Sequence, residues 1–590
     1  MFLRMKTRKK DGKTHRTWSV VENRRVAGGR VVQRQVLYLG EINDAQRAGW
    51  VRAIEAFEGD GNTARQLALF PSDRERLPPL PCEAVRIRLD KIRLCNPRQW
   101  GGCWMALWLW DYLCLDEFWS RRLDTTRKGV HWLNVLKALT CYRLLDPGSE
   151  FRFHRQWYDR SALGDLLGES PVIAGKNTLY RCLDRLLEHR DDLFSFLRQR
   201  WEDLFNARFD VLLYDLTSTY FQCDPPGRES KKRFGYSRDH RPDCVQVVIA
   251  LVVTPDGFPL AYEVYPGNTT DKNTLREFLR KIETRYGKIR RTWLMDRGIP
   301  TEETLKEMRD TNVAYLVGTP KGRLSTLEKK LVELPWEQAR QDVRVKTLEH
   351  EGDLYVYVES ANRIAKERAM RRRKLKKLWN RLKELREMTQ SRDDLLLRLG
   401  AAKKEAGRAW GLVTIRLPDN DQEVNGETFR FSLDKKRLRT TIGREGRYLL
   451  RSNLTGESAS GLWEKYLTLI QVEQAFKELK TDLSIRPVHH SKDLRVEAHI
   501  FICFLAYCLQ VTLKNLARGY APGLTPRAIL EKLQGIQMID LYLPTTDNRT
   551  VLLTRYTEPD RDTQLLLDTL KLPLPKQPPP KILANGNIAM

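Results

Sequence analysis

Three acidic residues, spread widely along the chain, have the types and settings needed to bind divalent cations. Asp215 lies in the apolar run VLLYDLTSTYF, and Asp296 ends the short apolar run RTWLMD just before Arg-Gly. Glu473 lies in YLTLIQVEQAFKELK, a stretch of strong helix formers without Gly or Pro. Two aspartates at the tips of buried strands and one glutamate on a helix would supply the oxygen ligands that Mg²⁺ prefers. A pair of such ions activates a nucleophile and stabilises the leaving oxygen of a phosphodiester.

The stretch around Glu473 is expected to form one helix from Tyr466 to Lys480, with Ser458 or Ser460 as a possible N-cap. Steps of three and four residues place one stripe on one face of that helix: Tyr466, Leu469, Glu473, Lys477 and Lys480. Such a face can hold a metal ion beside a phosphate backbone. The plainer alternative is a solvated amphipathic helix with a Glu473–Lys477 ion pair. Each aspartate, taken alone, has an equally plain alternative as a turn or cap residue.

These motifs together resemble the DDE transposases of insertion sequences, in the IS4-like group and most closely in its IS1634-type branch. That group carries the signature Tyr-x₂-Arg-x₃-Glu-x₆-Lys, and the corresponding positions here are Tyr466, Leu469, Glu473 and Lys480. Leu469 stands in the place of the arginine, so one expected contact to the DNA backbone is missing. The first aspartate of the family matches Asp215, and the second matches Asp296 in MDRG. The resemblance covers residues 205–515 well and extends loosely to LYLGEI at residues 37–42.

The resemblance implies an enzyme that cleaves the ends of an insertion sequence and joins their 3′-OH groups to target DNA. Asp215, Asp296 and Glu473 would be the catalytic acids and would hold two Mg²⁺ or Mn²⁺ ions. The implied partners are double-stranded DNA and a second copy of the chain in a synaptic homodimer. Two rival hypotheses remain open: a metal-dependent nuclease of the same fold without strand transfer, and a DNA-binding regulator derived from a transposase.

The charge balance fits a nucleic-acid partner. The 590 residues include 103 Lys and Arg against 76 Asp and Glu, a formal net charge of +27. An excess of this size suits DNA or RNA and predicts binding that weakens steeply with salt. The ten cysteines show no C-x₂-C metal-site spacing and are interpreted as reduced thiols of a cytoplasmic protein. No signal peptide is evident, and the longest apolar run, residues 500–509, is too short to span a bilayer.

The order of the elements predicts an α/β multidomain protein around an RNase H-like core, a mixed sheet flanked by helices. Three strands are expected at residues 209–214, 245–253 and 258–265, then helix, strand, helix and strand through residue 317. The expected domains are a small β/α unit (1–70), a helical DNA-binding domain (85–205), the first segment of the core (206–320), an insertion (321–455), the second segment of the core (456–545), and a C-terminal extension with a disordered tail (546–590). Residues 71–81 are expected to form a linker.

The spacing of the acids predicts the insertion. Asp215 and Asp296 lie 81 residues apart, which accommodates two strands and a helix, but Asp296 and Glu473 lie 177 residues apart. The intervening sequence contains β-rich runs such as VRVKTLEH and DLYVYVES, so a mostly β insertion is expected. It also contains a long basic helix at residues 365–385, in which ten residues are Lys or Arg. Its arginines Arg371, Arg372 and Arg373 are candidate DNA-backbone contacts; a solvated charged face is the alternative.

Overall fold

The structure is a computed structural model, and it divides into two compact units. The first unit contains residues 1–6, 16–291 and 469–590, and the second contains residues 7–15 and 292–468. Described in the structure are residues 1–10, 13–25, 31–44, 46–51, 54, 86–123, 130–223, 225–227, 229–287, 291–319, 327, 330–331, 334–388, 391–419, 422–486, 488 and 490–583. The predicted linker at 71–81 lies outside the described residues.

A three-stranded sheet begins the chain, in the order β1 (Phe2–Lys10), β2 (Lys13–Arg25) and β3 (Val31–Gly40). Strands β2 and β3 are antiparallel, with Val20 opposite Leu37, and both of these side chains are buried. The basic residues Arg4, Lys6 and Arg8 lie in β1, and Arg16 lies in β2. Three strands therefore form the start of the chain, within the range where a small β/α unit is expected.

Helices dominate the next stretch of the first unit. They are α2 (Gly101–Tyr112), α3 (Leu115–Trp119), α4 (Trp132–Leu145), α5 (Glu150–Arg152), α6 (Leu163–Leu167), α7 (Lys176–Leu183) and α8 (Arg190–Phe205). Tryptophans of this region contribute to the core: Trp110 is fully buried, and Trp104 stacks on Trp100 with ring centroids 5.7 Å apart. This burial removes these rings from any base-stacking role.

An antiparallel sheet follows, and it contains Asp215. Its strands are β5 (Val211–Phe221), β6 (Val245–Val253) and β7 (Pro259–Pro266), in that spatial order. Helix α9 (Asp271–Tyr286) comes next, then α16 (Ile470–Thr481) and α17 (Asp493–Tyr520) return to this unit. Helix α16 packs against β5 and β6. Helix α17 is long and apolar enough to cross a membrane, but 94% of its most apolar window is buried inside the protein, so it is the core helix of this unit.

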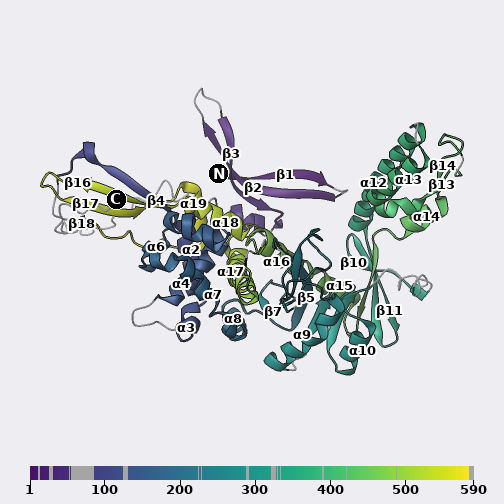
Figure 1. The fold of residues 1–590 in the computed structure, drawn as a ribbon, viewed down its shortest axis with the longest axis horizontal. Helices are drawn as coiled ribbons and strands as arrows, with labels where there is room; N and C mark the ends of the chain where they lie inside the picture. Colours follow the sequence, from purple (N-terminus) through teal and green to yellow (C-terminus); the bar gives the residue numbers. More distant parts are fainter. Residues whose placement is uncertain are drawn as a thin grey trace. The chain divides into compact units, whose positions relative to one another are not determined.

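The C-terminal residues form a sheet together with a segment from near the start of the helical region. Strands β4 (Arg93–Gln99), β16 (Gln537–Pro544), β17 (Thr550–Tyr556) and β18 (Lys581–Leu583) lie in the order β18-β17-β16-β4 (Figure 1). Helices α18 (Pro526–Leu533) and α19 (Arg561–Leu570) flank them in sequence. The prediction of a disordered tail is wrong for residues 571–583, because β18 pairs with β17. Residues 584–590 lie outside the described residues.

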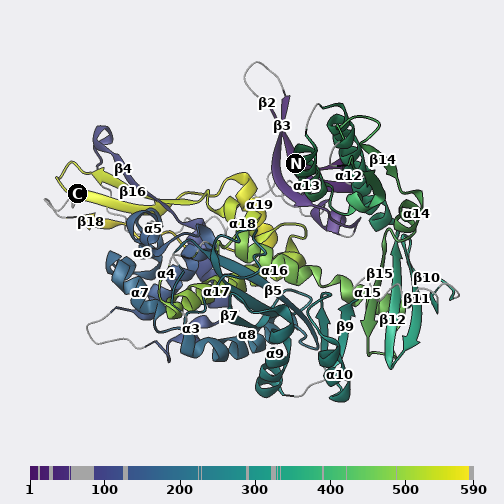
Figure 2. The ribbon, with the colours of Figure 1, turned by 45° about the vertical axis from the view of Figure 1, so that its right-hand side comes forward.

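The second unit is built on a mixed sheet in the order β10-β11-β12-β15-β9-β8. Its strands are β8 (Thr292–Met295), β9 (Ala314–Gly318), β10 (Glu337–Arg340), β11 (Val343–His350), β12 (Asp353–Ser360) and β15 (Arg447–Ser452). Strands β8 and β9 are parallel, and the other pairs are antiparallel. Figure 2 shows β10, β11, β12 and β15 side by side. Helix α10 (Glu302–Asp310) connects β8 to β9.

The predicted insertion contains more helix than strand, so the expectation of a mostly β insertion is wrong. Beyond the sheet strands it holds α12 (Ala361–Glu387), α13 (Arg392–Ala406), α14 (Lys435–Gly443) and the small hairpin β13 (Val413–Arg416) with β14 (Arg430–Leu433). Helices α12 and α13 lie side by side in both views (Figure 1, Figure 2) and share a leucine-rich core that includes Leu382 and Leu395. That core explains the helices, since apolar residues recur there at helical spacing.

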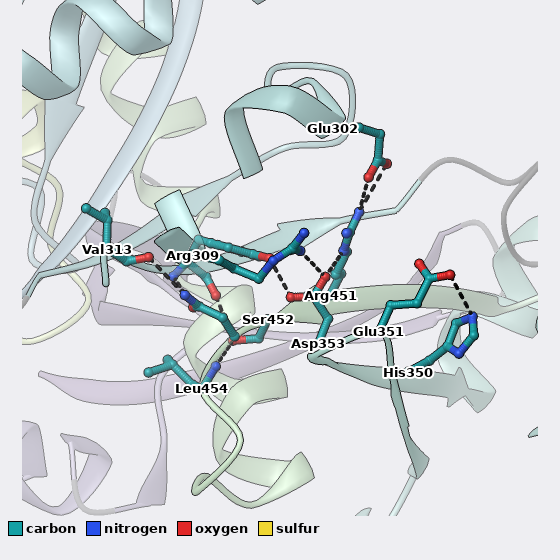
Figure 3. A network of polar contacts seen from close by, with 11 residues as sticks. Glu302, Arg309, Val313, His350, Glu351, Asp353, Arg451, Ser452 and Leu454 are labelled. Carbon is teal, nitrogen blue, oxygen red and sulfur yellow. Dashed lines mark hydrogen bonds and ion pairs between the residues drawn. The ribbon is translucent and has the colours of Figure 1, made fainter. Parts of the chain in front are cut away.

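A buried polar network ties the insertion to the strand after α10 (Figure 3). Asp353 of β12 is 1% exposed and accepts hydrogen bonds from the Arg309 guanidinium at 2.7 Å and from the Tyr315 hydroxyl at 2.5 Å. It also pairs with Arg451 of β15, whose guanidinium reaches Glu302 at 2.8 Å. Because each charge in the network has a partner of opposite sign, the buried carboxylate is compensated and fixes the spacing of β12, β15 and β9.

Candidate active site

Asp215 lies in the interior of strand β5. It is the fifth residue of that strand, is half-buried, and stands opposite Leu251 of β6. The prediction that it ends a strand is wrong, because residues 217–221, four of which are β-branched or aromatic, continue the ladder. Its Oδ1 atom accepts a hydrogen bond from the Leu216 amide at 2.7 Å.

Glu473 lies on α16, which packs against the strand that carries Asp215. Its side chain is exposed, whereas Val472, Ala475 and Phe476 of the same helix are buried. Helix α16 therefore presents Glu473 to solvent and its apolar side to the sheet, as an amphipathic helix does.

The single helix predicted from Tyr466 to Lys480 is two helices, and the prediction of one helix is wrong. Helix α15 (Ala459–Leu467) ends before α16 begins at Ile470. Thr468 ends α15 by bonding the Lys465 carbonyl with both its amide, at 3.0 Å, and its hydroxyl, at 2.6 Å. A threonine hydroxyl that competes for backbone carbonyls in this way is unfavourable inside a helix.

The residues on either side of the break between α15 and α16 show that the predicted stripe is interrupted. The predicted cap is present, since Ser458 accepts a hydrogen bond from the Gly461 amide at 3.1 Å. Leu469, in the place of the family's arginine, is 8% exposed and lies in the core. The five residues therefore do not form one continuous stripe: Tyr466 belongs to α15, and Leu469 faces inward.

Asp296 lies in the second unit, directly after strand β8, as predicted. Its exposed carboxylate accepts hydrogen bonds at Oδ1 from the Arg297 amide at 2.7 Å and from the Tyr466 hydroxyl at 3.4 Å. Burial, together with the nearby Asp296 carboxylate, raises the pKa of Tyr466 above its usual value, so the phenol remains a donor. A Cβ atom at Gly318 would lie 2.6 Å from this hydroxyl, so glycine leaves the space that Tyr466 needs.

The two lysines of α16 have different surroundings. Lys477 is exposed one turn after Glu473. Lys480 forms an ion pair with Asp239 at 2.8 Å, and Arg486 pairs with the same carboxylate. Burial lowers the pKa of the Lys480 ammonium, while Asp239 acts to raise it. The sequence pattern does not predict Asp239, since it lies 241 residues before its partner in a loop without periodic pattern.

The basic helix is present as α12, and its three candidate arginines differ. Arg372 and Arg373 are exposed, whereas the Arg371 guanidinium lies 2.5 Å from the buried Glu445 carboxylate. Arg371 also lines a hollow of 1270 Å³ within the second unit. Eight of its 22 lining residues are Lys or Arg and three are Asp or Glu, so the hollow is basic. The aromatic residues Tyr448 and Trp463 also line it.

A buried Glu-His-His group lies in the first unit, away from the predicted acids in sequence. The Glu150 carboxylate lies 3.2 Å from His490 Nε2 and 3.6 Å from His499 Nδ1. These are donor types that bind Zn²⁺ or Fe²⁺. However, the Arg143 guanidinium lies 3.4 Å from the same Nδ1 atom. A buried cation at this lone pair opposes a second cation there, so the group is better described as a charge-compensated structural network.

Protonation in this network follows from its burial. Burial and the nearby Arg143 guanidinium lower the pKa of His499 to about 4. Although burial acts to raise it, hydrogen bonds from His490 and His499 hold the pKa of Glu150 well below its usual value. His490 and His499 thus belong to a buried polar network that contains none of the three predicted acids.

Comparison with known proteins gives two family matches. Residues 210–509, slightly more than half of the chain, match the model of the transposase DDE domain. Residues 3–62 match the N-terminal domain of IS1634 family transposases. No curated protein matches the chain. A cryo-EM structure of the piggyBac transposase synaptic complex with hairpin DNA matches 73% of this chain and 79% of its own chain, at 8% sequence identity. The TM-score is 0.34, so this match supports no structural argument.

Proposed function

Because this chain belongs to the DDE transposase family, in the branch of the IS1634 transposases, it cuts DNA strands and joins them to a target, and we propose that Asp215, Asp296 and Glu473 are its catalytic acids. Each is a carboxylate at the position where the family signature expects one. DNA is the substrate, and the terminal inverted repeats of the insertion sequence are the ends that the enzyme would recognise.

The contact between Tyr466 and Asp296 carries this proposal. The two residues are 170 positions apart in the sequence, yet the Tyr466 hydroxyl lies 3.4 Å from the Asp296 carboxylate. The family signature assigns both to one site, and the second unit brings both together. Tyr466 would orient the carboxylate, while exposed Lys477 would contact a DNA phosphate beside Glu473.

The donor set fits Mg²⁺ or Mn²⁺. All three acids offer carboxylate oxygens, and Asp296 and Glu473 are exposed, so a hydrated hard cation can approach them. When bound, two such ions activate the attacking oxygen and stabilise the leaving oxygen of the phosphodiester. The chain itself would orient Asp296 through the Arg297 amide and the Tyr466 hydroxyl.

The finer architecture belongs to the same proposal. We assign β5, β6 and β7 with the later β8, α10 and β9 to an RNase H-like core, whose element order they follow. The helices from α2 to α8 would read the inverted repeats, and a synaptic homodimer would hold two ends in the cytoplasm. Arg372 and Arg373 of α12, which are exposed, would contact the DNA backbone.

Cleavage of a DNA fragment that carries the element's ends tests the assignment. Asp215→Asn, Asp296→Asn and Glu473→Gln should each abolish Mg²⁺-dependent cleavage and leave DNA affinity largely unchanged, because affinity comes mainly from Lys and Arg. Asp310→Asn, at an exposed acid of α10, is the matched control and should cleave normally. A triad variant with wild-type cleavage would remove that residue from the site.

An assay with pre-cut DNA ends that carry free 3′-OH groups distinguishes a transposase from a nuclease and from a DNA-binding regulator. Joining of these ends to a plasmid supports strand transfer by this site. Cleavage of intact ends without joining would support the nuclease, and binding without any metal-dependent cleavage would support the regulator. Light scattering of the protein with end DNA tests the homodimer, and a complex with one protein copy would contradict it.

A further inference from the structure

The loop that connects β5 to β6 carries two exposed aromatic rings. Phe234 is 51% exposed and Tyr236 is 84% exposed, and only Gly235 separates them. Exposed rings two residues apart in a loop expose apolar area to water, which costs free energy without a binding partner.

The backbone of this loop is held firmly. Arg233 and Gln246 exchange two backbone hydrogen bonds, at 3.0 and 2.9 Å. The Gln246 side-chain amide donates to the carbonyls of Tyr236 at 3.0 Å and Gly267 at 2.9 Å. A Cβ atom at Gly235 would lie 2.0 Å from the Gly267 oxygen, so glycine permits this close backbone contact. The rings therefore project from a fixed support, which reduces the ordering cost of binding.

Cationic residues flank the two rings in the sequence of the loop; Lys231 pairs with Glu497 and Arg241 with Asp243. Five bases and three acids lie among the described residues 229–243, and the bases include Lys231, Arg233 and Arg238. The loop also contacts α16, since Asp239 pairs with Lys480. Aromatic rings among cations form the surface that stacks on nucleic-acid bases while it attracts the phosphates beside them.

The strand register gives the distance from this loop to Asp215. Arg233 pairs with Gln246, which stands opposite Tyr220 of β5. Tyr220 is five residues from Asp215, which is about 17 Å along a strand. DNA rises about 3.4 Å per base pair, so this span equals about five base pairs.

We propose that Phe234 and Tyr236 form a stacking platform for DNA bases that are unstacked from the duplex near the cleaved end. This inference rests on the proposed function, because it places the DNA along β5 toward Asp215. Stacking tolerates any base, so the platform adds affinity for distorted DNA without sequence readout. The lysine and arginine side chains of the loop would contact the DNA backbone on either side of the unstacked nucleotides.

Binding measurements with defined probes test the platform independently of catalysis. The probes are a blunt 20-base-pair duplex, the same duplex with four central mismatched pairs, and a 20-nucleotide single strand, all in EDTA. The full-length Tyr236→Ala and Phe234→Ala variants should each lose about 5-fold or more in affinity for the mismatched duplex and the single strand. Affinity for the blunt duplex and the salt dependence should stay unchanged, because no charge is removed. EDTA removes cleavage, so failure of the catalytic assignment would not alter these results.

Three controls make the outcome decisive. Tyr236→Phe keeps a ring and should bind as the wild type does, and Tyr520→Ala, at another exposed ring, should have no effect. A 2-aminopurine in the mismatched segment should be quenched by the wild type and not by Tyr236→Ala. Equal losses on blunt and mismatched duplexes, unchanged affinity for every probe, or quenching that survives Tyr236→Ala would each overturn the proposal. So would a change in self-association without DNA, which would assign the rings to a contact between two copies.

Discussion

Replacing Asp239 with asparagine tests whether the acid holds the signature lysine in place. The Asp239 side chain is 4% exposed and lies between Lys480 and Arg486, whose side chains are 13% and 27% exposed. Asp239→Asn keeps the shape and removes the charge, which leaves two partly buried cations without compensation. Breaking a buried pair by removing one partner costs about 3–5 kcal/mol. Because the Arg486 guanidinium reaches water, we expect the lower end of this range, about 3 kcal/mol.

The loss should depend on pH in a defined direction. At about pH 7 Lys480 is protonated in the folded and the unfolded protein. Its pKa in the folded protein is lowered by burial, so on raising the pH the folded protein releases this proton before the unfolded chain does. The unfolded chain then binds more protons, and stability rises with pH in that window. Asp239→Asn removes the interaction that raises the pKa of Lys480, so the pH range in which stability rises extends toward neutral pH. The difference in unfolding free energy between the wild type and the variant therefore shrinks as the pH approaches about 10.

Urea denaturation of the full-length protein, followed by tryptophan fluorescence at several pH values, measures both effects. The double variant Asp239→Asn/Lys480→Met should recover some of the stability and show no such shrinkage, because the titrating group is gone. The reasoning is refuted if Asp239→Asn costs less than about 1 kcal/mol, or if its deficit is the same at every pH. In the first case the pair is a weak surface contact, and Lys480 is available for DNA.

Four further substitutions distinguish residues that stabilise the fold from residues that contact DNA. Leu469→Arg should lower the free energy of unfolding by about 2 kcal/mol or more, read from the urea midpoint, because a charge replaces a buried side chain. Arg372→Gln should flatten the salt dependence of DNA binding by up to about 0.9, whereas Arg371→Gln should leave the slope unchanged and cost stability, since Arg371 pairs with Glu445. Asp353→Asn should cost about 3 kcal/mol in thermal unfolding, because it removes the buried carboxylate that Arg309 and Arg451 share and leaves the buried Arg451, among the described residues, paired only with Glu302.

Much of the architecture is predictable where the signal is local. The strands VRVKTLEH and DLYVYVES are β11 and β12 with the expected ends, because alternating and β-branched residues define a strand over a few positions. Asp296 follows its strand as expected, since a Gly and a Pro nearby end the ladder. The basic helix is also predictable, since its composition favours a helix throughout.

The sequence-based predictions fail where contacts between distant parts of the chain determine the local structure. The sequence predicts a strand end at Asp215, but the strand continues because β6 supplies partners as far as Phe221. The break at Thr468 interrupts a run of strong helix formers, and propensity summed over a window does not detect it. The ion pair of Lys480 with Asp239 joins positions 241 residues apart, and β4 pairs with β16 across about 440 residues, for example between Arg98 and Met538. No local pattern encodes such partners.

The long gap between Asp296 and the signature helix also acquires a physical explanation. Strand β15, the last strand of the insertion, pairs with β9 on one side and β12 on the other, so the insertion adds strands to the sheet. The chain then enters α15, whose Tyr466 reaches Asp296. Trp463, on the same short helix, lines the basic hollow. The pairing of β15 with β9 therefore determines where α15 begins, and α15 determines how Asp296 is held. The insertion is thus a condition for the geometry around Asp296, one of the three acids proposed for catalysis.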